Sequence, residues 1–384
     1  MATQMLGQAE VNRSRLVQRF VEICRADSAP FQEGAVSRIV AGALKALGIS
    51  VWEDGAGKGV GGEVGNLIAT LPGRGPVANS DPILFSAHMD RVAGGIGVRP
   101  VIKGGVIQSA GDTILGADDA AGLAAIIEAI QLLVESGSHH VQIEIVCTIG
   151  EEVGLVGAKH LDISVLRSRC GFVLDADGEV GTIVNRAPTQ VSIKAELFGR
   201  SAHAGIAPEK GISAIKMAAV AISQMNLGRI DYETTANVGY IAGGGPSNVV
   251  PERAEIRAEA RSLDAAKLER QLAHMEAVLF DVATRFGGKV EWSARRNYEG
   301  FALDAESDPI QRARAAIVAA GLEPRLQSTG GGSDANVFNA RGIPCVVLGA
   351  GFQGIHTHME RMPISELVRL AEVVFRLMQG AGGP

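Results

Sequence analysis

The chain has 384 residues, of which 46% are hydrophobic and only 4% aromatic, and its formal net charge is −6. This length favours two domains, and the apolar content is ample for a folded core and argues against a disordered chain. The net negative charge gives no basic surface of the kind that binds nucleic acid. No apolar run reaches the roughly 18 residues of a membrane span.

The amino-terminal segment MATQMLGQAEVNRSR lacks the basic and then apolar pattern of a secretory signal, so we expect a cytoplasmic protein. The four cysteines are scattered along the chain and lie mostly in apolar runs, which predicts buried free thiols rather than disulfides or a cysteine-based zinc site. They are Cys24, Cys147, Cys170 and Cys345.

The first half of the chain alternates predicted helices and strands, which is typical of an α/β sheet domain. Helices are predicted where apolar residues recur at helical spacing, and strands where short apolar runs are bounded by turn residues. The predicted helices are 14–26, 34–47 and roughly 118–136. The predicted strands are 48–54, 66–71, 82–90, 141–149 and 171–175, with short strands and turns over 98–117.

The pattern changes from about residue 182. Strands with alternating apolar residues and two helices follow in the order β-α-β-β-α-β, which predicts a ferredoxin-like module whose helices cover one face of its sheet. Its predicted strands are 189–199, 236–244, 253–263 and 289–298, and its helices 211–225 and 265–286.

The α/β pattern returns after about residue 300. Helices are predicted over 308–320 and 363–379, with the glycine-rich turn STGGGSDA and a strand at 344–350 between them. We therefore predict a catalytic domain in two segments, 1–187 and 299–384, with residues 188–298 inserted as a separate domain.

Acidic and histidine side chains follow several of the predicted strands. IVCTIGEE ends in Glu151 and Glu152, SAHMD contains His88 and Asp90, and further candidates are Asp118, Asp175 and His356. Strand termini are where α/β proteins place chemistry, and imidazole with carboxylate suits zinc. Two ions about 3.5–4 Å apart can polarise a carbonyl, and such a site also needs a base that is not a ligand.

Each residue by itself has a plainer interpretation. The Glu151–Glu152 pair alone would suit a solvated turn, and His88 alone would suit a hydrogen-bonded structural histidine. Asp177 competes with Asp175 as the ligand, although Asp175 directly ends its apolar run. The two-metal interpretation therefore depends on the whole set.

Eight motifs in order resemble the co-catalytic zinc exopeptidases, which include peptidase T, acetylornithine deacetylase, succinyl-diaminopimelate desuccinylase and the glutamate carboxypeptidases. The resemblance covers about residues 15–378 and is strongest to the peptidase-T-like members. The motifs are SAHMDRV, LGADDAAGLA, TIGEEVGLVGAKHL, LDADG, GRSAHAGIAPEKGISAI, NVVPERAEIRAEARS, GGGSDANVF and IHTHMER.

The resemblance implies a role for each matching residue of a two-metal centre. His88 and Asp175 would bind one ion, Glu152 and His356 the other, and Asp118 would bridge them. A cis peptide bond would join Asp118 to Asp119. Glu151 matches the general base, Asp90 the acid that orients the His88 ring, and His203 a histidine that helps hold the substrate oxyanion. The matching substrate-contacting positions are Asn248, Arg261 and the Gly330–Ser333 turn with Gly331 and Gly332.

The resemblance also implies a fold, an activity and an assembly. The fold would be a zinc-exopeptidase catalytic domain with a central mixed sheet flanked by helices, plus an inserted ferredoxin-like α+β lid and dimerisation domain. Two Zn²⁺ ions, with Co²⁺ or Mn²⁺ as alternatives, would serve an aminopeptidase that hydrolyses short peptides. The protein would be a homodimer through the inserted domain, and whether His203 serves its own or the partner's centre stays open.

Three other functions fit parts of the same pattern. A deacylase or carboxypeptidase would use the same centre, with specificity set around Arg261 and Gly331. A non-catalytic peptide-binding protein would have no need of Glu151, and a structural dimerisation protein would need only the exposed strand edges of the inserted domain.

In one departure from the family pattern, Ala120 stands where Lys commonly follows the Asp-Asp pair.

Overall fold

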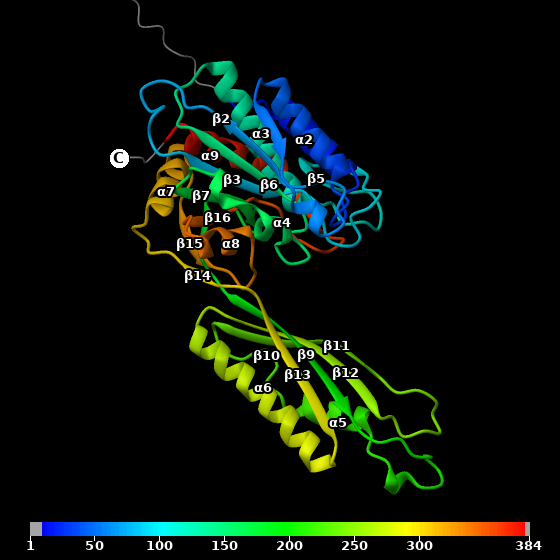
Figure 1. The fold of residues 1–384 in the computed structure, drawn as a ribbon. Helices are drawn as coiled ribbons and strands as arrows, with labels where there is room; N and C mark the ends of the chain where they lie inside the picture. The colour runs from blue at the N-terminus through cyan, green and yellow to red at the C-terminus, as the bar shows by residue number, and fades with distance from the viewer. Residues whose placement is uncertain (1–9, 381–384) are drawn as a thin grey trace, which may run out of the picture. The chain divides into compact units, whose positions relative to one another are not determined.

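The computed structural model describes residues 10–380, so the first nine residues of the segment that led us to expect a cytoplasmic protein lie outside the description. The chain divides into two compact units (Figure 1). The first takes in the chain up to Asn185, Ala302–Ser328 and the residues from Ser333, and the second takes in Arg186–Phe301 and Thr329–Gly332. None of the helices in the described part of the chain is long and apolar enough to cross a membrane.

A nine-stranded sheet forms the centre of the first unit, in the order β1-β2-β6-β3-β7-β16-β8-β14, with β15 also paired to β8. The strands are β1 (Ser50–Glu53), β2 (Leu67–Leu71), β3 (Ile83–His88), β6 (Ile143–Thr148), β7 (Cys170–Ala176), β8 (Thr182–Ala187), β14 (Phe301–Ala302), β15 (Arg325–Ser328) and β16 (Cys345–Gly349). The α-helices are α1 (Arg13–Arg25), α2 (Gly34–Ala46), α3 (Ala117–Ser136), α4 (Val156–His160), α7 (Asp308–Ala319), α8 (Asp334–Ala340) and α9 (Ile364–Met378).

The central strands of this sheet are buried along their whole length. Every residue of β3, β6 and β16 is buried, which requires cover on both faces of the sheet. Helices α1, α3, α7 and α9 pack together, while α4 and α8 form a second group. The predicted mixed sheet flanked by helices is thus confirmed. The four cysteines are buried free thiols, as predicted.

Strand direction decides where the ends of the central strands lie. β3 runs parallel to both β6 and β7, and β16 runs parallel to β7. The outer pairs β1–β2, β2–β6 and β16–β8 are antiparallel. The carboxyl ends of β3, β6, β7 and β16 therefore meet at one edge of the sheet, where open α/β sheets place their ligands.

A second, small sheet in this unit joins β4 (Pro100–Lys103), β5 (Val106–Ser109) and β17 (Arg361–Pro363) in the order β17-β5-β4. Its strand β17 comes directly after the loop that carries His356 and Glu360. The pairing of β17 with β5 therefore anchors the end of that loop.

The second unit is a five-stranded antiparallel sheet in the order β10-β11-β12-β9-β13. Its elements are β9 (Thr189–Phe198), α5 (Ala214–Gln224), β10 (Gly228–Arg229), β11 (Thr234–Gly243), β12 (Arg253–Ser262), α6 (Ala265–Phe286) and β13 (Lys289–Tyr298). Apart from the short β10, this is the predicted β-α-β-β-α-β order. Both helices pack on β12 and on each other, and Figure 1 shows them on one face of the sheet.

Candidate metal centre

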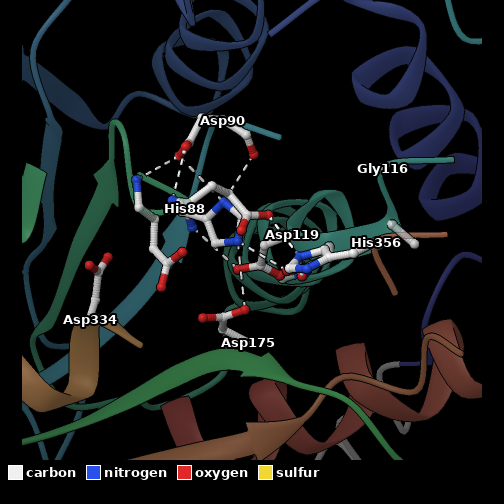
Figure 2. A network of polar contacts seen from close by, with 12 residues as sticks. His88, Asp90, Gly116, Asp119, Asp175, Asp334 and His356 are labelled. Atoms are coloured by element: carbon white, nitrogen blue, oxygen red, sulfur yellow. Dashed lines mark hydrogen bonds and ion pairs between the residues drawn. The ribbon is translucent and has the colours of Figure 1, made fainter. Parts of the chain in front are cut away.

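The side chains predicted to form the site in the first unit gather at the carboxyl edge of the large sheet. His88 is the last residue of β3, Asp175 lies near the end of β7, and Glu151 and Glu152 follow β6. Asp118 lies at the start of α3, and His356 lies in the loop after β16. Figure 2 shows His88, His356 and Asp175 turned toward a common centre. The competing candidate Asp177 is exposed.

Asp118 lies between the two histidines. Its Oδ1 lies 3.0 Å from Nε2 of His88, and its Oδ2 lies 3.2 Å from Nε2 of His356. The peptide bond from Asp118 to Asp119 is cis, as the family resemblance implies, and the regular part of α3 begins only after these two residues. Each oxygen of the Asp118 carboxylate therefore faces a different histidine.

Two groups of potential ligands share this carboxylate. Asp175 places Oδ1 3.6 Å from Nε2 of His88, and Glu152 places Oε1 3.2 Å from Nε2 of His356. The ligand atoms of His88, Asp118 and Asp175 lie within 4.8 Å of one another, and so do those of Asp118, Glu152 and His356. The two groups have the composition predicted for the two metal subsites.

The hydrogen bond at Nδ1 of His88 determines which nitrogen of the neutral ring carries the proton. Nδ1 of His88 lies 3.0 Å from the backbone carbonyl oxygen of Asp90, which can only accept a hydrogen bond. In the neutral ring the proton therefore resides on Nδ1, and the lone pair of Nε2 faces Asp118 and Asp175. The Asp90 carboxylate lies farther from Nδ1, at 3.6 Å, so the carbonyl is the group that orients the ring.

The pKa shifts at the centre show that its carboxylates are ionised more easily when positive charge lies nearby. Burial raises the pKa of Asp175 and of Glu151 well above their usual values, and neighbouring carboxylates add to the effect. Burial alone would lower the pKa of His88, but the carboxylates of Asp118, Asp175 and Asp90 raise it. Hydrogen bonds to Asp118 and Glu152 raise the pKa of His356 to about 10. The carboxylates thus favour positive charge at the positions of the two histidines.

The Asp90 carboxylate holds the turn that carries the two glutamates. Its Oδ1 accepts the backbone N–H of Glu151 at 2.9 Å, and its Oδ2 accepts that of Glu152 at 3.1 Å. Asp90 is only 1% exposed, and Figure 2 shows it on the opposite side of His88 from Asp175. One buried residue therefore fixes His88 through its carbonyl and the glutamate turn through its carboxylate.

Three acids that support the centre were not identified from the sequence. Glu360 accepts the N–H groups of Gly116, Ala117 and Asp118 at 2.7, 2.8 and 3.2 Å, which connects the His356 loop to the bridging aspartate. The Asp119 carboxylate accepts the N–H of His88 at 3.3 Å.

The third supporting acid is Asp334, at the start of α8. Its Oδ2 accepts the Thr148 hydroxyl at 2.5 Å, whereas its Oδ1 is buried without a hydrogen-bond partner among the described residues. The sequence signal for these three acids was their place inside the motifs already quoted, GADDAAG, IHTHMER and GGGSDANVF. Nothing in those motifs told which atoms the acids would contact.

The remaining predicted residues belong to the second unit and form two separate groups. His203 pairs with Val249 in an isolated bridge, and the backbone carbonyl of Asn248 accepts the N–H of Ala204 at 2.8 Å, so His203 and Asn248 lie together. Arg261 donates to the carbonyl of Gly330 at 3.3 Å, next to Gly331 and Gly332. Arg261 lies near the far end of β12 from Asn248, so the structure does not bring the two groups together.

The donor set fits a pair of divalent metal ions. Each subsite offers one imidazole nitrogen and carboxylate oxygens, the combination that suits zinc and is also compatible with manganese or cobalt. Among residues 10–380, the ion pairs of Asp118, Glu152 and Asp175 are with His88 and His356, so a bound metal ion would supply positive charge to all three carboxylates.

The chain is similar to known proteins of a peptidase family. The model of a family described as peptidase family M20/M25/M40 matches residues 84–380. The chain is 45% identical over 371 residues to an uncharacterised protein, YqjE, of Bacillus subtilis strain 168, covering 97% of this chain and 99% of that protein.

Two solved structures are similar over nearly their whole length. The aminopeptidase PepT of Bacillus cereus ATCC 10987 matches with a TM-score of 0.88 and 44% identity, covering 97% of this chain and 99% of that one. A tripeptidase of Staphylococcus aureus subsp. aureus Mu50 matches with a TM-score of 0.92 and 40% identity, covering 97% and 100%.

Proposed function

The chain belongs to peptidase family M20/M25/M40, and on that premise we propose that it is a two-metal aminopeptidase acting on short peptides. The likeness to an aminopeptidase and a tripeptidase at 44% and 40% identity supports this substrate class. The single observation that carries the proposal is Glu151. This buried carboxylate interacts electrostatically with Asp175 and His88 of one ligand group and with Glu152 of the other, and it is a member of neither group.

We propose Zn²⁺ as the native ion, held by His88 and Asp175 in one subsite and by Glu152 and His356 in the other, with Asp118 shared. When bound, the two ions would polarise the scissile carbonyl and lower the pKa of water. Glu151 takes the proton of the attacking water and later delivers it to the leaving amine. Asp90 keeps Glu151 and Glu152 in place through their backbone N–H groups.

His203 is proposed as a hydrogen-bond donor to the substrate oxyanion. Its Nδ1 accepts the backbone N–H of Gly205 at 3.2 Å, so in the neutral ring the proton resides on Nε2. The side chain is exposed and its Nε2–H is directed away from that backbone contact. A hydrogen-bond donor of this kind suits an oxyanion.

The positions of His203 and Arg261 favour a shared site in a homodimer. Arg253 and Arg261 are separated along β12 by about eight residue steps, roughly 27 Å of extended strand, and His203 lies beyond the Arg253 end. One rigid sheet cannot bring both residues to the same short peptide. If both contact the substrate, the two groups come from different subunits. Arg261 contacts Gly330, three residues before the chain returns to the first unit at Ser333, so we propose that His203 and Asn248 are the residues that come from the partner subunit.

We expect His203→Ala to lower kcat by roughly 10²-fold, the scale for loss of one oxyanion donor, with both metal ions retained. Steady-state kinetics beside metal analysis of the purified variant measure this effect. A kcat within about twofold of the wild type would remove His203 from the mechanism.

Mixing two inactive variants tests the shared site. In a dimer of His203→Ala and Glu151→Gln chains, the His203→Ala centre would receive an intact histidine from its partner. After subunit exchange, activity per chain should recover to about one quarter of the wild type, because half the dimers are mixed and each has one complete centre. No recovery, in a mixture that native mass spectrometry shows to contain mixed dimers, would place His203 in its own centre.

The substrate class is tested with matched peptides on metal-reconstituted protein. We expect cleavage of a tripeptide with a free amino terminus, no cleavage of its N-acetylated form, and little effect of carboxyl-terminal amidation. Hydrolysis of N-acyl amino acids instead would identify a deacylase, and a requirement for a free carboxyl terminus would identify a carboxypeptidase. Binding without turnover across the whole series would identify a peptide-binding protein.

A further inference from the structure

The turn after β6 is held by side chains rather than by strand pairing. Four consecutive backbone N–H groups, from Ile149 to Glu152, each donate to a buried side-chain oxygen. The accepting residues and distances are Asn66 for Ile149 (3.2 Å), Glu33 for Gly150 (2.9 Å), and Asp90 for Glu151 (2.9 Å) and Glu152 (3.1 Å). The direction of the Glu151 side chain therefore depends on these three acceptors.

Glu33 is the least expected of the three, because it comes from the loop between α1 and α2. It is fully buried, and its Oε1 accepts the N–H of Gly150 at 2.9 Å and that of Phe31 at 2.8 Å. Its Oε2 has no hydrogen-bond partner among the described residues. Burial raises the pKa of Glu33 to about 7, so the carboxyl group is kept there at a cost to stability.

A second contact from the same loop reaches the same glycine. Gly150 has a φ of +56°, and a Cβ atom at this position would lie 2.7 Å from Cε1 of the Phe31 ring. Phe31 itself has a φ of +69°, a backbone conformation uncommon for a residue with a side chain. The loop thus contacts Gly150 from two sides, through the Glu33 carboxylate and the Phe31 ring.

The loop also binds the segment that carries Asp90. The Ser28 hydroxyl donates to the carbonyl of Met89 at 2.6 Å, and the N–H of Arg91 donates to the carbonyl of Ser28 at 2.9 Å. Residues 28–33 therefore connect both segments that position Glu151. They lie outside residues 84–380, which the family model matches.

We propose that Glu33 is a positioning residue of the catalytic centre, which sets the direction of Glu151 by holding the N–H of Gly150. It acts through the backbone and contacts neither substrate nor metal. This inference rests on the proposed function, because it takes Glu151 as the base. A displacement of about 1 Å at a reacting group can lower a rate about 10²-fold, so a single hydrogen bond at this turn is enough to matter.

Three variants separate positioning from general stability. Glu33→Ala removes both hydrogen bonds, whereas Glu33→Gln keeps an oxygen where Oε1 lies. The matched control is Glu144→Ala, since Glu144 is also buried and its carboxylate accepts the backbone N–H groups of Arg167 and Ser168, in a loop that carries none of the site residues.

We expect Glu33→Ala to lower kcat about 10- to 100-fold, with KM within about threefold of the wild type and two ions still bound. Glu33→Gln should restore kcat to within about threefold, and Glu144→Ala should leave kcat unchanged at temperatures where it is folded. Amide hydrogen exchange should increase over 149–155 in Glu33→Ala and over 166–169 in Glu144→Ala, and this readout does not need activity.

Several outcomes would overturn the proposal. These are a Glu33→Ala kcat within about twofold of the wild type, a Glu33→Gln loss as large as that of Glu33→Ala, an equal loss in Glu144→Ala, or unchanged exchange over 149–155. If Glu33→Ala does not fold, Glu33→Asp replaces it, because the shorter side chain cannot reach Gly150. Failure of both to fold would make Glu33 a folding residue. A wild type without peptidase activity would refute the proposed function, while the exchange result would still report on the turn.

Discussion

Replacement of Glu151 by glutamine is expected to lower kcat by roughly 10²–10⁴-fold while both metal ions remain bound. Glutamine has the size of glutamate and keeps the backbone N–H that Asp90 holds, but it cannot accept the proton of the attacking water. The ligand groups do not include Glu151, so their atoms are unaffected. Steady-state kinetics and metal analysis on the same preparation measure the two effects together.

Glu152→Gln is the matched control, because the two residues are adjacent and share Asp90 as the acceptor of their N–H groups. Oε1 of Glu152 lies 3.2 Å from Nε2 of His356. The change to glutamine removes the negative charge of this ligand and should lower metal occupancy in that subsite. Loss of metal in Glu151→Gln with full occupancy in Glu152→Gln would show that the two roles are reversed.

The fold was predictable where a local pattern was strong. Residues 265–286 were predicted as one helix from their apolar spacing, and α6 has those bounds. The runs that end at His88 and Asp175 were long and apolar enough to indicate buried strands. Because the carboxyl ends of parallel strands share an edge, the sequence predicted that these side chains would meet.

Other elements have no local pattern to predict. Strands β8, β14 and β15 are short or polar, and they exist because β16 and the neighbouring strands offer a pairing partner. His356 lies in an irregular loop at a φ of +60°, so no strand pattern placed it at the sheet edge, and only the family resemblance gave it a role as a ligand. Tertiary context, rather than propensity, determines such segments.

Glu33 and the three supporting acids were missed for a related reason. Glu33 contacts a backbone N–H group 117 residues away, and Glu360 contacts groups up to 244 residues away. A carboxylate that accepts backbone N–H groups leaves no periodicity in the sequence, and an acid next to a turn is ordinarily exposed. Such residues become visible only when burial and hydrogen-bond partners are known.

Metal removal is expected to abolish activity, and addition of Zn²⁺ or Co²⁺ to restore it. The stronger test is the number of ions that each ligand variant retains. The wild type should bind two ions per chain, because the structure holds two ligand groups. Asp175→Ala and Glu152→Ala each remove a ligand of one subsite only and should each leave about one ion per chain.

Asp118→Ala should behave differently from the other two, because Asp118 belongs to both ligand groups. Its Oδ1 faces His88 and its Oδ2 faces His356, so both subsites lose a ligand at once. We expect close to zero ions per chain in this variant, measured by elemental analysis after gel filtration in metal-free buffer. Retention of one tightly bound ion in Asp118→Ala would contradict a bridging carboxylate. A wild type fully active with at most traces of metal after exhaustive chelation would refute the two-metal centre itself.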